Sequence, residues 1–308
     1  MEPIAPKKRD GRYWRNLLVV TLVELLIGAL LVAYVVLPIL YANGVAHPKR
    51  ASVCCATPAD HGLAYEDMSF KTRDGLTLRG WYIPSKNKAA VLVAHGIGGN
   101  RASPLAQVAA LGRHGYGVLL FDLRAHGDSE GNTITFSGED VSAAATFLQH
   151  RADVNPDQIG AMGISLGGLV VIQSAASTND IKAIVADGGG LAAFEDEPRP
   201  ATVAHWLDLP FQWVTFRVWE RQGVSAPASV VKALPRIAPR PVLLIAGTQS
   251  KFEQGMMRKF YAAAGQPKTL WEIPEAGHIG GWAARPEEYE KRIATFFDHA
   301  LQRVNVSN

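Results

Sequence analysis

Beyond residue 64, short apolar runs alternate with longer segments in which apolar residues recur at helical spacing. Residues 65–84 alternate in polarity on both sides of Arg73-Asp74-Gly75, which predicts a β-hairpin. Strands are predicted at 89–96, at the start of 117–131, and at 159–162, 181–187, 241–247 and 268–274, and helices at 103–115, 138–151, 166–176, about 253–264 and about 286–303. This alternation is typical of the α/β class, with a mostly parallel sheet and helices on both faces.

The pattern near the N-terminus is different, because residues 17–41 form one long apolar run whose only charged residue is Glu24. As a helix this run rises about 36 Å, which is enough to cross the hydrocarbon core of a bilayer with some tilt. Five basic residues precede it within residues 1–16, and only Lys49 and Arg50 closely follow it. The positive-inside rule therefore predicts a cytoplasmic segment over 1–16, a transmembrane helix over 17–41 and an extracytoplasmic remainder, with membrane lipid around the helix.

Two other interpretations of this apolar run stay open from the sequence. Gly44-Val45-Ala46 is an acceptable small-x-small cleavage site, which would make the segment a removed signal peptide. The run is, however, longer than the apolar region of a signal peptide, which has roughly 7–15 residues. A buried core helix is the second alternative, although such helices rarely run this long without polar residues.

Length and composition set the domain organisation. The chain has 308 residues, 48% hydrophobic and 19% charged, which allows one large globular domain or two small ones. Residues 42–64 contain prolines, glycines and small polar residues and predict a linker, so the folded domain is expected over 65–304. The net charge of +3 is small and the body of the chain has no run of basic residues, so we expect no nucleic-acid partner. The adjacent Cys54 and Cys55 do not predict a disulfide framework or a zinc site.

One serine lies where an apolar strand pattern changes into a helical pattern. Ser165 has Gly163 two residues before it and Gly167 two residues after it. A tight turn at a strand–helix junction raises the hydroxyl clear of the sheet, and small neighbours leave room for that turn. The turn also directs a backbone N–H at the start of a helix toward the reacting oxygen. A serine that only caps the helix beside packing glycines is the alternative, but the position at the junction favours a nucleophile.

Three further stretches accompany this serine. His-Gly-Ile-Gly-Gly-Asn at 95–100 follows a predicted strand, Phe-Asp-Leu-Arg-Ala-His-Gly-Asp-Ser-Glu-Gly occupies 121–131, and Pro-Glu-Ala-Gly-His at 274–278 follows the last predicted strand. Together with the serine turn, they make residues 65–303 resemble the α/β-hydrolase family, of the esterase and serine-peptidase-like kind. Ala125 departs from the family pattern, which usually has a glycine there. The resemblance implies an α/β-hydrolase fold.

The resemblance also implies a role for several residues. Ser165 would be the nucleophile, and His278 the general base and then the acid that protonates the leaving group. The oxyanion hole would consist of the backbone N–H groups of Leu166 and Ile97. His95 is expected to shape its loop rather than to take part in the chemistry.

The acid of the predicted triad has two candidates. The family usually has an aspartate where this chain has Ser250, and a serine cannot stabilise an imidazolium as a carboxylate does. Glu253 is the expected acid, because it is the nearest carboxylate and its longer side chain can compensate for a shifted backbone. Asp187, at the end of the preceding strand, is the other candidate. If neither carboxylate pairs with His278, the chain would be a weakened or inactive enzyme. Asp122 and Asp128 are expected to hold loops together.

A long insert at about 190–235 separates two of the predicted strands. It contains five large aromatic residues: Trp206, Phe211, Trp213, Phe216 and Trp219. The insert is expected to be a sheet-covering helix with a segment packed on it, a helical lid whose aromatic side chains line an apolar pocket, or both.

The sequence as a whole predicts a membrane-anchored serine hydrolase that forms an acyl-Ser165 intermediate, most of all a carboxylesterase. The substrate would be a small-molecule ester or a short peptide. A serine peptidase acting on short peptides is one alternative, and a non-catalytic binding protein with this fold is another. No metal and no organic cofactor is expected, because the glycine loop at 95–100 lacks P-loop spacing and the chain has no His-Glu-x-x-His motif.

Overall fold

A single sheet forms the centre of the folded domain in the computed structural model, which describes residues 10–302 except 199, 201 and 225–228. Its strands are β1 (Glu66–Lys71), β2 (Thr77–Ile83), β3 (Ala90–Ala94), β4 (Gly117–Phe121), β5 (Ile159–Ile164), β6 (Ala183–Asp187), β7 (Val242–Gly247) and β8 (Lys268–Ile273). They lie in the order β1-β2-β4-β3-β5-β6-β7-β8. The strands from β4 to β8 pair in parallel, and β1 and β2 are antiparallel to their neighbours.

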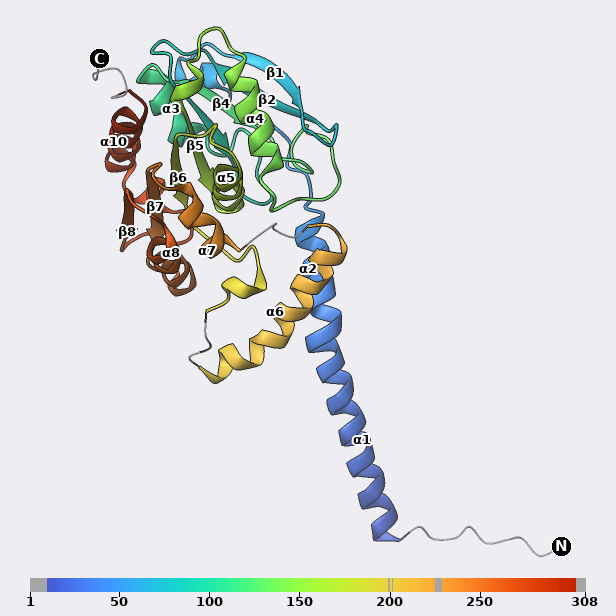
Figure 1. Cartoon of the computed structure of the whole chain (residues 1–308). Helices are drawn as coiled ribbons and strands as arrows, with labels where there is room; N and C mark the ends of the chain where they lie inside the picture. The colour runs from blue at the N-terminus through green and yellow to red at the C-terminus, as the bar shows by residue number, and fades with distance from the viewer. Residues whose placement is uncertain (1–9, 199, 201, 225–228, 303–308) are drawn as a thin grey trace, which may run out of the picture.

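Helices cover both faces of this sheet (Figure 1). α3 (Leu105–Arg113) and α10 (Pro286–Phe297) belong to the apolar core on one face. The core on the other face includes residues of α4 (Glu139–Gln149), α5 (Leu166–Ser177), α7 (Val230–Ala233) and α8 (Lys251–Ala263). Strands buried on both faces need apolar residues at every position, which explains why their sequence pattern is continuous rather than alternating. The predicted mostly parallel sheet with helices on both faces is confirmed.

The predicted elements differ from the observed ones mainly at their ends. The strand predicted at 181–187 begins at Ala183, and the strand predicted at 89–96 ends at Ala94. The helix predicted at 286–303 is α10 followed by a π-helical turn over Asp298–Gln302, and residues 303–304 lie outside the described residues. A short helix, α9 (Gly281–Ala284), precedes α10 and was not predicted.

The N-terminal helix is longer than the sequence predicts. It runs through α1 (Gly11–Leu31), the π-helical turn η1 (Val32–Val36) and α2 (Leu37–Ala46), where a helix over 17–41 was expected. The Asp10 carboxylate accepts a hydrogen bond from the N–H of Tyr13, which caps the first turn. No residue of α1 is buried, and the helix is long and apolar enough to cross a membrane. Residues 1–9 of the predicted basic segment lie outside the described residues.

The predicted linker at 42–64 needs a correction, because its first five residues belong to α2. Ala42 and Ala46 are one helical turn apart and both are fully buried in the core of the domain. Both are apolar, so their side chains alone do not distinguish a face that packs on protein from one that meets lipid. The segment that follows is also fixed, since the Arg50 guanidinium donates to backbone carbonyls of the loop over 126–131, and Cys54 and Cys55 form a disulfide.

The insert predicted at about 190–235 contains one long helix outside the two layers that cover the sheet. This helix, α6 (Val203–Arg221), crosses α2 and lies apart from the sheet in Figure 1. Short 3₁₀ turns, η4 (Phe194–Asp196) and η5 (Leu234–Ile237), flank α6 and α7. The Asp196 carboxylate accepts a hydrogen bond from the N–H of Val230 at 2.7 Å, which caps α7 and ties the two ends of the insert together.

Candidate active site

The sheet order reverses between β3 and β5. The chain passes from β3 to β4 on one side, and the next strand, β5, pairs with β3 on its other side. The crevice beyond the carboxyl ends of the strands at such a switch point is the usual ligand site of open α/β sheets. The loop that begins at His95 follows β3, and Ser165 follows β5, so both lie at this crevice.

The backbone of Ser165 has an unusual conformation, with φ 54° and ψ −114°. A non-glycine residue in such a region costs on the order of 1–3 kcal/mol, so the surrounding structure must hold it there. Its N–H donates to the carbonyl oxygen of Asp187 at 2.8 Å. A Cβ on Gly163 would lie 2.2 Å from the carbonyl carbon of Gly167, and one on Gly167 would lie 2.0 Å from the Ala94 oxygen. The two glycines are therefore required by the close backbone contacts of this turn.

His278 lies between Ser165 and Glu253 and hydrogen-bonds to both. Its Nε2 is 3.0 Å from the Ser165 hydroxyl oxygen, and its Nδ1 donates to Oε2 of Glu253. The hydrogen bond with Glu253 raises the pKa of His278, against the opposing effect of partial burial, and the charges of Glu253 and Asp187 act in the same direction as the bond. A histidine with a raised pKa is a stronger base toward the serine proton.

Glu253 owes its position to the way that α8 begins. The Ser250 hydroxyl accepts a hydrogen bond from the N–H of Glu253 at 3.3 Å and caps the helix, so Glu253 lies in the first turn. One carboxylate oxygen of Glu253 accepts the N–H of Gly247 at 2.7 Å, and the other accepts from His278. The residue is 1% exposed, and both oxygens are held in fixed directions. Glu253 thus offers a carboxylate to His278 from three residues beyond position 250, where the family usually has an aspartate.

The other candidate acid, Asp187, hydrogen-bonds to a tyrosine instead of His278. Its carboxylate accepts a hydrogen bond from the Tyr289 hydroxyl at 2.5 Å, and within the described chain it makes no hydrogen bond to His278. Burial raises the pKa of Asp187 to about 7, with the bond from Tyr289 lowering it and the charge of Glu253 raising it. Of the two candidates, the structure brings only Glu253 to the imidazole ring.

Two backbone N–H groups at the crevice have no acceptor among the described residues, those of Leu166 and Ile97. Leu166 is the first residue of α5, so its N–H is one of the free donors at the positive end of a helix. Ile97 lies in the loop after β3, and its side chain lines the same cavity as Ser165. An oxygen that develops negative charge beside Ser165 is the kind of acceptor that such donors favour.

Two buried histidines shape the loop that carries Ile97. Nε2 of His95 accepts the N–H of Leu123 at 3.1 Å, and Nε2 of His126 accepts the N–H of Gly98 at 3.1 Å. Burial lowers the pKa of His95 to about 3, with a smaller contribution from His126, so the ring stays neutral and keeps its acceptor nitrogen. His95 thus has the loop-shaping position expected from the sequence.

The neighbouring loop is held by a buried carboxylate. Asp122 accepts hydrogen bonds from the N–H of Arg101 at 2.6 Å, from the Arg101 guanidinium at 2.5 Å and from the N–H of Asp128 at 2.9 Å. Asp128 in turn forms an ion pair with Arg101 at 2.7 Å. Both aspartates hold loops, as expected. Ala125, where the family has glycine, has a positive φ of 64°.

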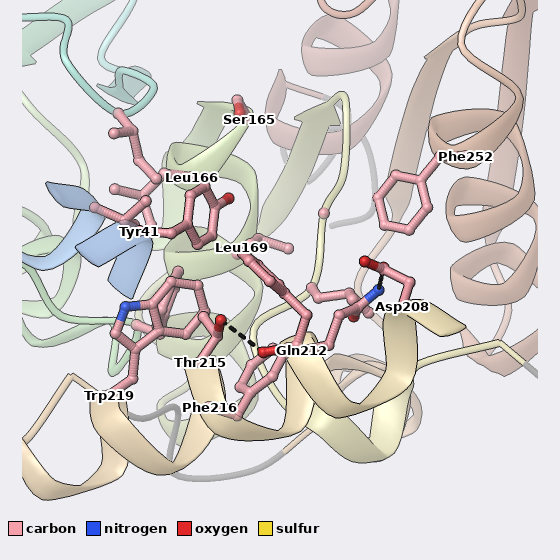
Figure 2. Close-up of a pocket in the computed structure, with 16 residues that line it drawn as sticks. Tyr41, Ser165, Leu166, Leu169, Asp208, Gln212, Thr215, Phe216, Trp219 and Phe252 are labelled. Atoms are coloured by element: carbon pink, nitrogen blue, oxygen red, sulfur yellow. Dashed lines mark hydrogen bonds between the residues drawn. The ribbon is translucent and has the colours of Figure 1, made fainter. Parts of the chain in front are cut away.

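A cavity of about 340 Å³ lies beside Ser165, and Figure 2 shows its walls. α6 forms the side opposite Ser165, with Phe216 and Trp219 pointing into the space. Tyr41 of α2 closes one end and Phe252 of α8 stands at the other. Small-molecule sites are typically concave, mostly apolar spaces of this size with a few polar groups.

The lining of the cavity differs from the predictions in two ways. Of the five aromatic residues of the insert, Phe211, Phe216 and Trp219 line the cavity, whereas Trp206 and Trp213 are exposed. Tyr41 and Val45 also line it, although the sequence assigned them to the transmembrane helix and the linker. Their hydropathy alone gave no signal that α2 packs on the domain. Within the described residues, no group of three or more His, Cys, Asp or Glu side chains is placed to hold a metal ion.

A mostly parallel sheet of this order, with a strained serine turn at its switch point, defines an α/β hydrolase. The alpha/beta hydrolase family model matches residues 91–292, and the chain belongs to this family. It is 28% identical over 289 residues to the uncharacterized protein YfhR of Salmonella typhimurium, a match that covers 88% of this chain and 93% of that one.

Solved structures resemble the same region. An esterase of Pyrococcus furiosus, Pf2001, is 25% identical with a TM-score of 0.67, and the match covers 83% of this chain and 99% of the esterase. The alpha/beta hydrolase GrgF of a Penicillium species shares the fold at 20% identity with a TM-score of 0.64, over 78% of this chain and all of GrgF. The resemblance predicted from the sequence motifs is confirmed at the level of family and fold.

Proposed function

We propose that this α/β hydrolase is a serine hydrolase that cleaves carboxylic esters and is anchored in a membrane by its N-terminal helix. One observation carries the proposal: a hydrogen-bonded chain runs from Glu253 through His278 to Ser165, at the edge of an apolar cavity. The esterase of Pyrococcus furiosus among the similar structures supports the ester assignment.

The geometry supports acyl transfer in two steps. His278 takes the proton of the Ser165 hydroxyl as the oxygen attacks the ester carbonyl, and the N–H groups of Leu166 and Ile97 bind the oxyanion. Glu253 stabilises the imidazolium that forms and holds its Nδ1 in the donor state. The imidazolium then protonates the leaving alcohol, and the same base activates a water molecule that releases the acid from Ser165.

The cavity favours an ester over a peptide. Its walls are mainly apolar, and Asp208 is the one charged side chain among the described residues that line it. Gln212 donates a hydrogen bond to the Asp208 carboxylate at 2.6 Å, so part of its acceptor capacity is used. A short peptide carries two charged termini and a row of amides, which this lining leaves without partners. A non-catalytic binding protein would not need a strained serine held against a paired histidine.

The contacts of α2 favour a retained anchor over a cleaved signal peptide. Cleavage after Ala46 would remove Tyr41 and Val45 from the cavity wall. It would also remove the Ala42 carbonyl, which accepts a hydrogen bond from the Trp219 indole at 3.0 Å. The basic residues before the apolar run and the positive-inside rule then give a cytoplasmic N-terminus and an extracytoplasmic domain.

A fluorophosphonate probe tests the proposal, because it reacts with serines that are activated for acyl transfer. We expect the full chain to label promptly and Ser165→Ala to lose all labelling, while Ser177→Ala, at the exposed end of α5, labels like the parent. A parent chain that does not label, or a Ser165→Ala variant that still does, overturns the assignment. Protease treatment of intact cells tests the orientation, since the domain should be digested without lysis.

A further inference from the structure

Helix α6 has an apolar face that is largely exposed in the described protein; the Arg217 guanidinium lies over the ring of Trp213, 5.6 Å from its centroid, at one end of this face. We call it the outer face of α6; it consists of Val203, Trp206, Leu207 and Trp213, which are 76%, 62%, 59% and 49% exposed. Their spacing of three, four and seven residues puts them on one side of the helix. A contiguous apolar surface on a folded domain marks a contact with another molecule or with a membrane.

The opposite side of the same helix lines the cavity. Phe211, Thr215 and Trp219 recur at spacings of four residues and face the space beside Ser165 (Figure 2). A helix that only covered the cavity would carry polar residues on its other side. Because both sides are apolar, α6 separates the cavity from an environment that also accepts apolar side chains.

Figure 1 shows how α6 runs relative to the sheet and to α1. From its crossing with α2, α6 runs away from the sheet, on the side from which α1 projects. The ring of Tyr41 lies 5.8 Å from that of Phe211 and fixes the crossing. Val203, Trp206 and Leu207 belong to the end of α6 that is remote from the sheet.

Apart from Asp208, which lines the cavity, the charged residues of α6 lie toward the end that packs on α2. Arg217, Glu220 and Arg221 all lie in the last turns of α6, where Trp219 and Gln222 hydrogen-bond to α2. The first turns carry the exposed apolar residues instead. The apolar end therefore points toward the membrane that α1 would span, and the charged end away from it.

The length of the anchor helix gives the depth of Tyr41, and with it the depth of the cavity wall and α6, relative to the edge of the bilayer. With Leu17 at the inner boundary of the hydrocarbon core, about 20 helical residues cross it and the outer boundary lies near Val36. Tyr41 is five residues further on, about 7–8 Å beyond that boundary along the helix. The cavity wall formed by Tyr41 thus lies in the headgroup layer, where tryptophan side chains such as those of the outer face are enriched.

We propose that the outer face of α6 rests in the outer leaflet and that the cavity takes the acyl chain of a membrane lipid ester directly from this leaflet. The inference rests on the proposed function and specifies its substrate. The ester bond between the acyl chain and the lipid alcohol breaks, the acyl group passes to the Ser165 oxygen, and the alcohol leaves with the proton from His278. Water then takes the acyl group and a fatty acid is released.

The contact with the bilayer can be measured without any reaction. The full chain is placed in phosphatidylcholine vesicles with and without brominated acyl chains, which quench nearby tryptophan. We expect the double variant Trp206→Phe/Trp213→Phe to lose part of the quenching, while Trp271→Phe, a buried residue packed on Tyr289, keeps all of it. Unchanged quenching in the double variant overturns the proposal, because Trp206 and Trp213 then do not contact the acyl chains. A second copy or another protein that covers both tryptophans would give this result.

The route of the substrate is tested with two esters. The double variant Val203→Gln/Leu207→Gln should lose about tenfold or more in kcat/KM on 4-methylumbelliferyl palmitate embedded in vesicles, because the outer face no longer enters the leaflet. The same variant should stay within about twofold of the parent on water-soluble p-nitrophenyl butyrate, since neither residue lines the cavity.

The matched control is Glu287→Gln/Lys291→Gln, two exposed residues of α10 on the far side of the sheet domain from α6, which should change neither rate. An equal loss on both esters, or no loss on the embedded one, contradicts entry from the leaflet. A parent chain that hydrolyses neither ester and does not label overturns the proposed function instead, and the quenching experiment still decides the contact with the bilayer.

Discussion

Nδ1 of His278 donates a hydrogen bond to Glu253, a residue in the first turn of a helix rather than in the loop before it. The loop position belongs to Ser250, whose hydroxyl caps that helix through the N–H of Glu253. The carboxylate is thus offered from a rigid element, and the bond from the N–H of Gly247 fixes its second oxygen. A carboxylate with both oxygens engaged holds the imidazole in one orientation, which is what a general base requires.

The assignment of the acid is tested by two amide substitutions. Glu253→Gln keeps an acceptor for Gly247 but cannot stabilise an imidazolium, so we expect kcat to fall about 10³–10⁴-fold on p-nitrophenyl butyrate. Asp187→Asn should cost less than about tenfold, because Asp187 bonds to Tyr289 and not to the imidazole. The reverse order of the two losses would make Asp187 the acid.

The pH dependence of the rate follows from the raised pKa of His278. The base must be neutral to accept the serine proton, so kcat/KM should rise with pH through the pKa of His278. The bond with Glu253 favours the charged ring and raises the pKa of His278. The rising part of the pH–rate profile should therefore lie above the ordinary histidine pKa of about 6.5. Glu253→Gln removes that preference, and its residual activity should rise at a lower pH than that of the parent. The two profiles are measured from pH 4.5 to 9. If the rise occurs at the same pH in Glu253→Gln and in the parent, Glu253 does not raise the pKa of His278.

The cap of α8 gives a third prediction. Ser250→Ala removes the acceptor for the N–H of Glu253 and should lower the free energy of unfolding by about 1 kcal/mol. Because Glu253 lies in the turn that loosens, kcat should also fall, while KM changes little. Ser250→Thr keeps a hydroxyl at the cap and serves as the control. A stability loss without any change in kcat would show that the carboxylate is held by Gly247 alone.

The local patterns of the chain predicted most of the fold and indicated Ser165, and the resemblance to the α/β-hydrolase family implied roles for His278, Leu166 and Ile97. The buried strands have continuous apolar runs that are visible in the sequence. Ser165 is flanked by Gly163 and Gly167, which the close backbone contacts of its turn require. His278 was implied by the resemblance of the motif after the last strand to that of the α/β-hydrolase family. These features are local, so the sequence displays them without knowledge of the tertiary structure.

The remaining features depend on contacts between distant segments. The choice between Glu253 and Asp187 required the exact start of α8 and the bond that occupies Asp187, neither of which has a pattern of its own. The inward packing of Ala42 and the cavity position of Tyr41 were missed for another reason. An apolar residue fits both lipid and a protein core, so hydropathy cannot distinguish the two environments.

Asp187 makes the stability of the protein depend on pH. Burial raises its pKa from an ordinary 3.8 to about 7, so between these values the folded protein holds a proton that the unfolded chain has released. Stability contributed by this group is present below the lower value and is lost as the pH rises through the upper one, a change of about 4 kcal/mol. Asp187→Asn lacks this loss and keeps an acceptor for Tyr289.

The thermal unfolding midpoints in detergent at pH 4 and pH 8 measure this effect. The midpoint of Asp187→Asn minus that of the parent should become more positive from the lower to the higher pH. Glu287→Gln, an exposed carboxylate of α10, is the control and should show no such trend. A difference that is constant or falls with pH would mean that Asp187 is charged throughout this range.

Part of the N-terminal anchor helix belongs to the site. Tyr41 closes the cavity, and its ring lies 5.8 Å from Phe211 and 6.4 Å from Trp219. Tyr41→Ala removes an apolar wall that binds the substrate equally before and during the reaction, so KM for apolar esters should rise about tenfold with little change in kcat. Tyr41→Phe keeps the ring and should restore the KM of the parent.

Tyr13→Ala, in the first turn of α1, changes the same residue type in the anchor but remote from the cavity. If the helix only tethers the domain, Tyr13→Ala and Tyr41→Ala should behave alike, and both should leave the KM for a soluble ester unchanged. If α2 is part of the site, only Tyr41→Ala raises it. Because the backbone of α2 is bonded to Trp219 beside this ring, the anchor and the substrate wall are one continuous helix, and the second outcome is the one that this connection requires.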